Sequence, residues 1–131
     1  KEIEVYSCGI FAETGDYATS NSVEAVKKYG VDLCKHRATN IQDSQIEKMD
    51  LILCATLSHK QHVLYRYPAL EGKVYTIKEY AQTDKTEGKD IQDPWGYDYA
   101  TYCSCAEEIE KNLQMIYKKI IGDIDKKEEN D

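Results

Sequence analysis

A short apolar run over residues 50–55 constrains the fold more than any other feature of the chain. An unbroken apolar run of this length is typical of a strand that is buried on both faces of a parallel sheet. A helical pattern over residues 58–67 follows it and stops before Pro68. Residues 73–77 then predict another strand. Strands that alternate with helices in this way predict an α/β fold with a mainly parallel sheet.

The first half of the chain contains two further candidate elements. Residues 2–7 alternate in polarity and predict a strand. Asn21 and Glu24 have the spacing of a helix capping box, with Asn21 as the N-cap. The helix that they begin is expected to end at Gly30, because glycine is the common residue just after a helix.

The second half of the chain ends in one long amphipathic helix. Its apolar residues keep a 3.6-residue period from Tyr99 to Ile120, and Gly122 predicts its end. Residues 123–131 are mostly charged and predict a frayed tail. We therefore expect a single domain over residues 1–122, followed by a charged tail.

Charge and composition exclude several classes of partner. The net charge of −7 disfavours nucleic acid and anionic membranes, which both require clustered lysine and arginine. No apolar run approaches the roughly 20 residues needed to span a bilayer, and the first residues predict a strand and not a signal peptide. The five cysteines are an odd number, which disfavours a disulfide scaffold and predicts reduced thiols in the cytoplasm.

The cysteines do not have the spacing of a phosphate-binding loop. A cysteine-dependent phosphatase needs a thiolate, five intervening residues and an arginine, because the backbone N–H groups and the guanidinium together bind one phosphate. In this chain the residue six positions after a cysteine is never arginine: Thr14, Asn40, Lys60, Ile109 and Lys111 occupy those places. Cys54 and Lys60 come nearest, but lysine lacks the bidentate fork of arginine.

The run Asp93-Pro94-Trp95-Gly96 is the most informative short motif. Proline fixes its own φ and restricts the preceding residue, so that it can hold the aspartate carboxyl in one direction. The neighbouring tryptophan could stack on a ring substrate. The simpler interpretation is a turn before a helix, which proline and glycine also explain. No metal site is predicted, because the cysteine and histidine spacings do not supply a set of zinc ligands.

In order and spacing, several segments resemble a low-molecular-weight protein tyrosine phosphatase of bacterial type. The resemblance covers about residues 3 to 120, and its motifs are listed here in chain order: Val5 to Ile10, Asn21 to Asp32, His36 to Ala38, Ile46 to Leu53, Ser58 to Lys60, Val74 to Ala81, Asp93 to Gly96, and Tyr102 to Ile109. Each motif is weakly specific by itself, and their order makes the resemblance specific.

The resemblance implies a three-layer α/β/α fold with a four-stranded parallel sheet of order 2-1-3-4. The family's first strand, phosphate loop and first helix have no counterpart among these residues. We therefore expect the chain to be a truncated or processed form, or to pair its open strand edges with another copy, because unpaired backbone in a sheet is costly when buried.

The resemblance also implies a mechanism and its residues. In the family a cysteine thiolate attacks phosphorus, and the aspartate of the Asp-Pro run protonates the leaving oxygen and then helps to activate water. Asp93 corresponds to this general acid and base, and Trp95 to a wall for the substrate ring. Ser7 and His36 correspond to residues that brace the phosphate loop by hydrogen bonds. The reaction requires no cofactor and no metal, and the expected substrate is a phosphotyrosine protein or a small aryl phosphate.

This chain contains neither the nucleophile nor its arginine, so we expect it to be inactive by itself. Three alternatives remain open. Protein arginine phosphatase is a close rival, because the loop that decides between the two is missing. Arsenate reductase is less favoured, since no cysteine lies between Cys54 and Gly88. A degenerate phosphatase fold that serves as a binding module is the third.

Overall fold

The computed structural model describes residues 3–130, apart from the side chains of residues 86, 87 and 130. The described residues form two compact units. Unit 1 comprises residues 51–92 and 107–130 together with residue 3, and unit 2 comprises residues 4–50 and 93–106. The long helix α5 (Tyr99–Asn130) contributes to both units. The single domain over residues 1–122 stays a prediction.

Unit 1 is built on a parallel pair of strands, β1 (Ile52–Cys54) and β2 (Val74–Thr76). Helix α2 (Leu57–Arg66) lies between them in the chain, and the Thr56 hydroxyl accepts the His59 N–H at its start. Both strands and the helix lie where the sequence predicted them. The chain therefore has an α/β fold with a parallel sheet.

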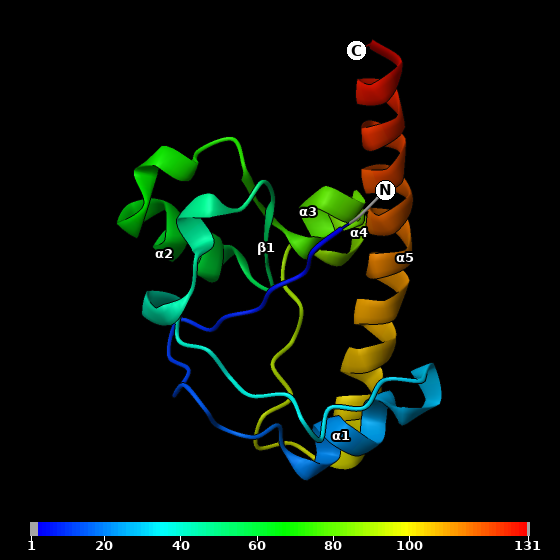
Figure 1. The fold of residues 1–131 in the computed structure, drawn as a ribbon. Coiled ribbons are helices and arrows are strands. Elements are labelled where there is room, and N and C mark those ends of the chain that lie inside the picture. Colours follow the sequence, from blue (N-terminus) through cyan, green and yellow to red (C-terminus); the bar gives the residue numbers. More distant parts are fainter. Residues whose placement is uncertain (1–2, 131) are drawn as a thin grey trace. The chain divides into compact units, whose positions relative to one another are not determined.

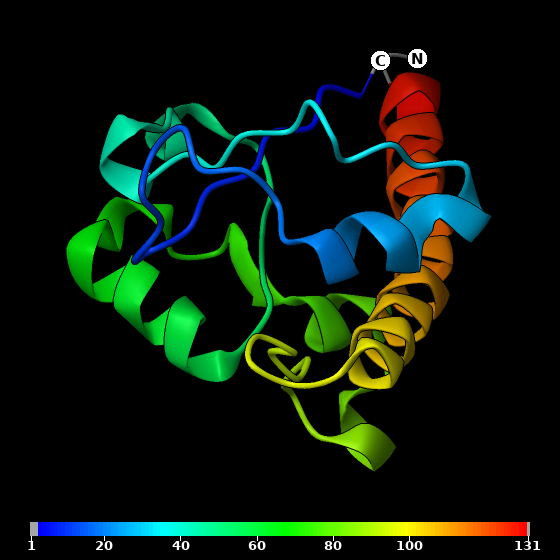
Figure 2. The same ribbon diagram turned by 90° about the horizontal axis from the view of Figure 1, so that it is seen from below.

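The two faces of this sheet are covered by different helices. Leu51, Leu53 and Tyr75 pack against a buried cluster that includes Ile116 of α5. Successive side chains in a strand point to opposite faces, so Ile52, Cys54, Val74 and Thr76 face the other way. Helix α2 contacts both strands, and the two ribbon views place α2 and α5 on opposite sides of them (Figures 1 and 2). Unit 1 thus has helix, sheet and helix layers.

Three short helices complete unit 1. They are η4 (Pro68–Leu70), α3 (Ile77–Ala81) and α4 (Asp84–Glu87). Helix α3 follows β2 directly and places Tyr80 and Ala81 in the core with Ile116. On the same side, Asn112 of α5 is fully buried and accepts the Thr83 hydroxyl at 2.6 Å. This hydrogen bond therefore fixes the segment after α3 to α5, next to the apolar contact that Tyr80 and Ala81 make with Ile116.

Helix α5 continues through Gly122, so the predicted helix end at this residue was wrong. A glycine ends a helix when it adopts a left-handed conformation. The glycines with positive φ are Gly15, Gly30, Gly72, Gly88 and Gly96, and Gly122 is not among them. The charged residues after it are mostly lysine and glutamate, which favour helix, and they extend α5 to Asn130.

Unit 2 consists mainly of loops, with α1 (Ser20–Val26) and the single turns η1 (Lys27–Tyr29), η2 (Ile41–Asp43) and η3 (Ile46–Lys48). The predicted N-cap Asn21 was wrong by two residues, because Thr19 accepts the Ser22 N–H instead. Gly30 ends this helical segment with a φ of 76°, as predicted. Asn40 donates its side-chain N–H to the Ala12 carbonyl at 2.8 Å, which ties two loops together.

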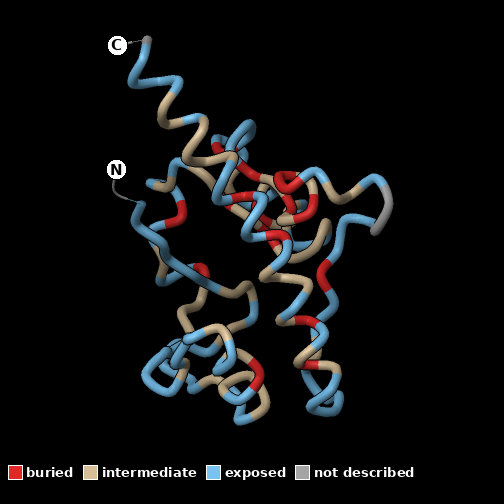
Figure 3. The backbone as a smooth tube through the Cα atoms, turned by 90° about the vertical axis from the view of Figure 1, so that its right-hand side faces the viewer, coloured by how far each residue is buried: buried red, intermediate tan, exposed pale blue. Residues whose placement is uncertain are grey.

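The strand predicted over residues 2–7 is absent from the described residues 3–7. Val5 is 85% exposed and Tyr6 is 67% exposed, and Figure 3 colours this segment as exposed. A strand is stable only when a neighbour satisfies its backbone, and in the described part of the chain no neighbour pairs with this segment. Glu2 lies outside the described residues. Among the described residues, no helix is both long and apolar enough to cross a membrane.

Candidate functional site

The loop after Asp93 in unit 2 consists of two consecutive turns. The Asp93 Oδ1 accepts the Trp95 backbone N–H at 3.1 Å, and the Pro94 carbonyl accepts the Tyr97 N–H at 2.9 Å. Gly96 has a φ of 84°, in the region that favours glycine. This loop therefore holds the Asp93 carboxylate through its own backbone.

A helix cap that sequence analysis missed ends this loop. The Asp98 Oδ1 accepts both the backbone N–H and the hydroxyl of Thr101, at 3.0 and 2.7 Å. These hydrogen bonds lower the pKa of Asp98, the hydroxyl making the larger contribution and the backbone N–H the next. The signal was present in the sequence, since an aspartate just before a helical pattern is a preferred N-cap. The cap fixes the join between the Asp93 loop and α5.

The Asp93 carboxylate and the Trp95 ring are both open to solvent. Asp93 is exposed, and among the described residues its second oxygen, Oδ2, has no hydrogen-bond partner. The side chain of Trp95 is 73% exposed. An accessible carboxyl beside an accessible aromatic ring can transfer a proton to a ring substrate in that position.

Ser7 and His36 are exposed residues of the same unit. The contacts of His36 are made by its backbone: its N–H donates to the Leu33 carbonyl at 3.1 Å, and its carbonyl accepts from Arg37 at 2.9 Å. In the described part of the chain, no hydrogen bond joins either side chain to the Asp93 loop. Their predicted role in bracing a phosphate loop stays a prediction.

The Arg37 guanidinium interacts with neighbouring groups of unit 2. Its guanidinium carbon lies 3.5 Å from the centroid of the Tyr17 ring. One guanidinium nitrogen donates to the carbonyls of Cys34 and His36, at 3.1 and 2.9 Å. Sequence analysis gave Arg37 no such role. Its donors are directed at backbone and an aromatic face, and so they stabilise the local loop.

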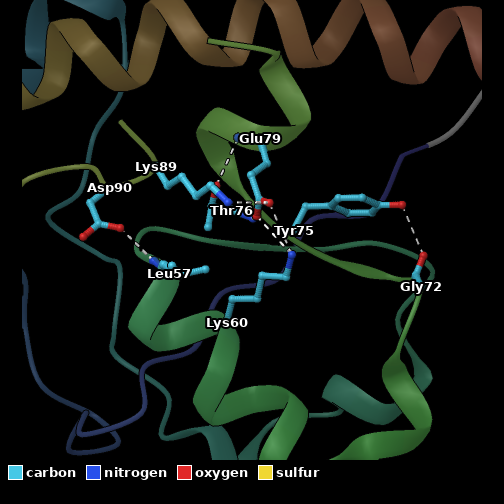
Figure 4. A network of polar contacts seen from close by, with 8 residues as sticks. All are labelled: Leu57, Lys60, Gly72, Tyr75, Thr76, Glu79, Lys89 and Asp90. Carbon is cyan, nitrogen blue, oxygen red and sulfur yellow. Dashed lines mark hydrogen bonds and ion pairs between the residues drawn. The ribbon is translucent and has the colours of Figure 1, made fainter. Parts of the chain in front are cut away.

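The run from Cys54 to Lys60 folds as the end of β1 and the start of α2. Cys54 is buried, and the Lys60 ammonium pairs with Glu79 at 3.1 Å (Figure 4). The first N–H of α2, on Leu57, is occupied by the Asp90 carboxylate at 2.8 Å. A phosphate at this helix end would meet that carboxylate. This geometry agrees with the buried-cysteine interpretation and not with a phosphate loop.

Glu79 is the centre of a polar network that sequence analysis also missed. Thr76 and Glu79 form a capping box, in which the Thr76 Oγ1 accepts the Glu79 N–H at 3.0 Å and the Glu79 Oε1 accepts the Thr76 N–H at 2.9 Å. The Lys60 ammonium lies 3.1 Å from Glu79 Oε1, and the Lys89 ammonium lies 3.8 Å from Glu79 Oε2. The Thr76 N–H, and after it Lys60, lower the pKa of Glu79 against an opposing desolvation.

Comparison with known proteins decides the family. Residues 1–128 match the family described as low molecular weight phosphotyrosine protein phosphatase. The chain belongs to this family. The resemblance found in the sequence is confirmed, and this phosphatase-family chain has a parallel β-α-β unit built from β1, α2 and β2.

The relatives of this phosphatase-family chain are named either protein-arginine-phosphatase or low molecular weight protein-tyrosine-phosphatase. The chain is 28% identical to a protein-arginine-phosphatase of Geobacillus stearothermophilus, over 90% of this chain and 77% of the relative. It is 31% identical to a probable low molecular weight protein-tyrosine-phosphatase of Ralstonia nicotianae, with the same two coverages.

The similar solved structures are likewise of an arginine phosphatase and of a protein tyrosine phosphatase. The YwlE arginine phosphatase from Geobacillus stearothermophilus has a TM-score of 0.82 at 28% identity, over 92% of this chain and 75% of that one. A low molecular weight protein tyrosine phosphatase from T. tengcongensis has a TM-score of 0.78 at 33% identity, over 87% and 76%. The chain is thus a member of a protein phosphatase family with both types of relative.

Proposed function

We propose that this chain carries the acid side of a protein tyrosine phosphatase that hydrolyses phosphomonoesters through a phosphocysteine intermediate. The observation that carries the proposal is the Asp93 loop. Its two turns direct one carboxylate oxygen to the Trp95 N–H and leave Oδ2 accessible. Asp93 in its protonated form donates to the leaving phenolate oxygen, and as a carboxylate it later takes a proton from water. Trp95 forms a wall for the substrate ring.

The 131-residue chain by itself is proposed to be inactive, because it contains no Cys-x5-Arg run. The nearest run leads from the buried Cys54 to Lys60, whose ammonium is paired with Glu79. Without a thiolate and an arginine, nothing in the Asp93 loop attracts a phosphate dianion, and the carboxylate of Asp93 repels it. The odd number of cysteines, five, disfavours a disulfide scaffold, which supports our proposal that the chain resides in the reducing cytoplasm.

Two measurements test the proposal. The purified chain is first assayed with p-nitrophenyl phosphate, for which we expect no turnover; turnover that vanadate inhibits would refute inactivity. A strand, Cys-x5-Arg loop and helix from a family member are then fused before Ile3, and the fusion is expected to hydrolyse aryl phosphates.

The role of Asp93 is tested in this fusion by Asp93→Asn. A general acid contributes about 10²–10⁴-fold, and the loss should be greater for phenyl phosphate than for p-nitrophenyl phosphate. Nitrophenolate is a weak base that needs little protonation on leaving, whereas phenolate is a strong one. The matched control is Asp98→Asn, which keeps the helix cap and should leave the dependence on the leaving group unchanged. An equal loss with both substrates would argue against Asp93 as the acid.

Protein arginine phosphatase is the second candidate, and the relatives of that name support it. The YwlE arginine phosphatase from Geobacillus stearothermophilus has a TM-score of 0.82 against this chain. A donor phosphate loop would bring its own specificity, so the fusion cannot distinguish the two substrates. The product of the natural gene should be compared on phosphotyrosine and phosphoarginine peptides, and preferential cleavage of the P–N bond of phosphoarginine would favour the second candidate.

A further inference from the structure

Unit 1 contains a groove that shares no lining residue with the Asp93 loop. It has a volume of about 580 Å³ and lies between the end of α3 and the second half of α5. Tyr80 and Ala81 line it on the α3 side, and Met115, Lys118 and Gly122 are among the residues that line it on α5. A volume of this size accommodates a few side chains of a partner.

Gly122 forms a notch in the α5 wall for which the chain itself gives no steric reason. Glycine inside a helix is unfavourable relative to alanine, so its presence there usually has a cause in packing or function. A Cβ added at Gly122 would meet no atom within 4 Å. The space in front of this residue is therefore not needed by any described part of this chain, and the notch is open to an outside group.

Lysines flank the notch. Lys118 and Lys126 lie four residues before and after Gly122, which places them on one face of α5, about 12 Å apart along the helix. Neither has an ion-pair partner among the described residues. Lys119 also lines the groove, and its ammonium lies 4.1 Å from the centroid of the Tyr80 ring.

One acidic residue opposes these lysines in the lining. Asp123 lies 3.5 Å from the Tyr80 hydroxyl, which donates to it. Three lysines and one aspartate leave the lining with a charge of +2, in a chain whose net charge is −7. The apolar part of the floor comes from Ala81 and Met115, and methionine adapts readily to different partner side chains. The groove thus combines an apolar notch with positive charge on both sides.

We propose that this groove binds an acidic peptide segment of a partner protein, with an apolar side chain in the notch at Gly122 and acidic groups at Lys118 and Lys126. The proposal follows from charge complementarity and from the unfilled space, and it does not depend on catalysis. The probe is a fluorescein-labelled peptide with one central leucine between three glutamates on each side. Its control has glutamines in place of the glutamates. Fluorescence anisotropy at low salt is expected to show binding of the acidic peptide alone.

Charge reversal locates the binding. The double variant Lys118→Glu, Lys126→Glu is expected to weaken binding at least tenfold. The matched control is Lys35→Glu, Lys127→Glu, which changes the net charge equally at exposed lysines outside the groove, and it is expected to change binding less than twofold. Equal losses in the two double variants would show general electrostatic attraction and would overturn the proposal.

The notch is tested by Gly122→Leu. Leucine favours helix over glycine, so the midpoint of thermal unfolding should rise while peptide affinity falls at least fivefold, and unfolding of the variant cannot explain that loss. Unchanged affinity would overturn the proposal. It would also be overturned if the acidic peptide did not bind at millimolar concentration, if phosphatidylserine vesicles bound to the groove lysines, or if light scattering showed that the groove pairs two copies of the chain.

Discussion

The capping box at the start of α3 gives a prediction that can be worked out from its contacts. Thr76 is fully buried, and its hydroxyl accepts the Glu79 N–H at 3.0 Å. Thr76→Val keeps the shape of the side chain and removes this acceptor. The Glu79 N–H, at the first turn of α3, then has no partner in a partly buried position.

The expected cost of Thr76→Val follows from two contributions. Removal of a threonine N-cap costs about 1 kcal/mol, within a range of roughly 0.5–2. A buried donor without a partner adds a desolvation penalty of similar size in the less favourable cases. The Glu79 Oε1 still accepts the Thr76 backbone N–H, because the substitution leaves the backbone intact. We therefore expect the free energy of unfolding to fall by about 1–2 kcal/mol.

Glu79→Gln tests the charged half of the same network. The pKa of Glu79 is lowered in the folded state, first by the Thr76 N–H and then by Lys60. A lowered folded pKa stabilises the protein at pH values above the unfolded pKa of about 4.5, and the stabilisation is lost as the pH falls through the folded value. Lys60 and Glu79 are 22% and 20% exposed, and desolvation offsets part of the attraction in such a partly buried pair, so we expect it to contribute about 1 kcal/mol.

The assay is urea unfolding followed by far-ultraviolet circular dichroism at pH 7 and at pH 3. Thr76→Val should lose stability at both pH values, whereas the deficit of Glu79→Gln should be present at pH 7 and shrink at pH 3. A matched control is Lys89→Gln, which removes the weaker, half-exposed neighbour at 3.8 Å and should have little effect. The reasoning is refuted if Thr76→Val costs less than about 0.3 kcal/mol, or if the deficit of Glu79→Gln grows as the pH falls.

Three other substitutions have defined outcomes. Gly96→Ala forces a φ of 84° on alanine, so it should lower stability by about 1 kcal/mol in thermal unfolding. Asn112→Ala removes the fully buried partner of Thr83, and we expect a loss of about 1–3 kcal/mol by urea unfolding. We also propose that the exposed segment around Val5 pairs copies of the chain; Val5→Lys should then shift light-scattering masses from oligomer to monomer, and a monomeric parent chain would contradict this.

Sequence patterns predicted the elements whose cause is local. The apolar run before Cys54 and the stop at Pro68 both act within a few residues, and they correctly predicted β1 and the end of α2. Strand pairing depends on residues that are far apart in the chain. The alternation over residues 2–7 was correctly observed, but it could not reveal whether a neighbouring strand would satisfy the backbone.

The misjudged helix end at Gly122 has a different origin. A helix ends at a glycine when the residues after it do not favour helix, so the position of the helix end depends on the whole following segment. Here that segment is rich in lysine and glutamate, which favour helix, and α5 continues through Gly122. The cap at Thr76 was missed because this residue lies in the segment interpreted as a strand, and the cap at Asp98 was missed because it lies between the Asp93 motif and the predicted helix.

The conformation of the Asp93 loop is determined by its own residues, and this matters for a fusion that supplies the proposed nucleophile. The turn at Pro94, the left-handed Gly96 and the Asp98 cap all form within residues 93–101. None of these contacts requires a phosphate loop, so the direction of the Asp93 carboxylate relative to its own backbone is set before any nucleophile is supplied. A fusion that provides the Cys-x5-Arg loop should therefore require no redesign of the Asp93 loop. If a folded fusion needed changes within residues 93–98 to become active, the loop would not be set locally.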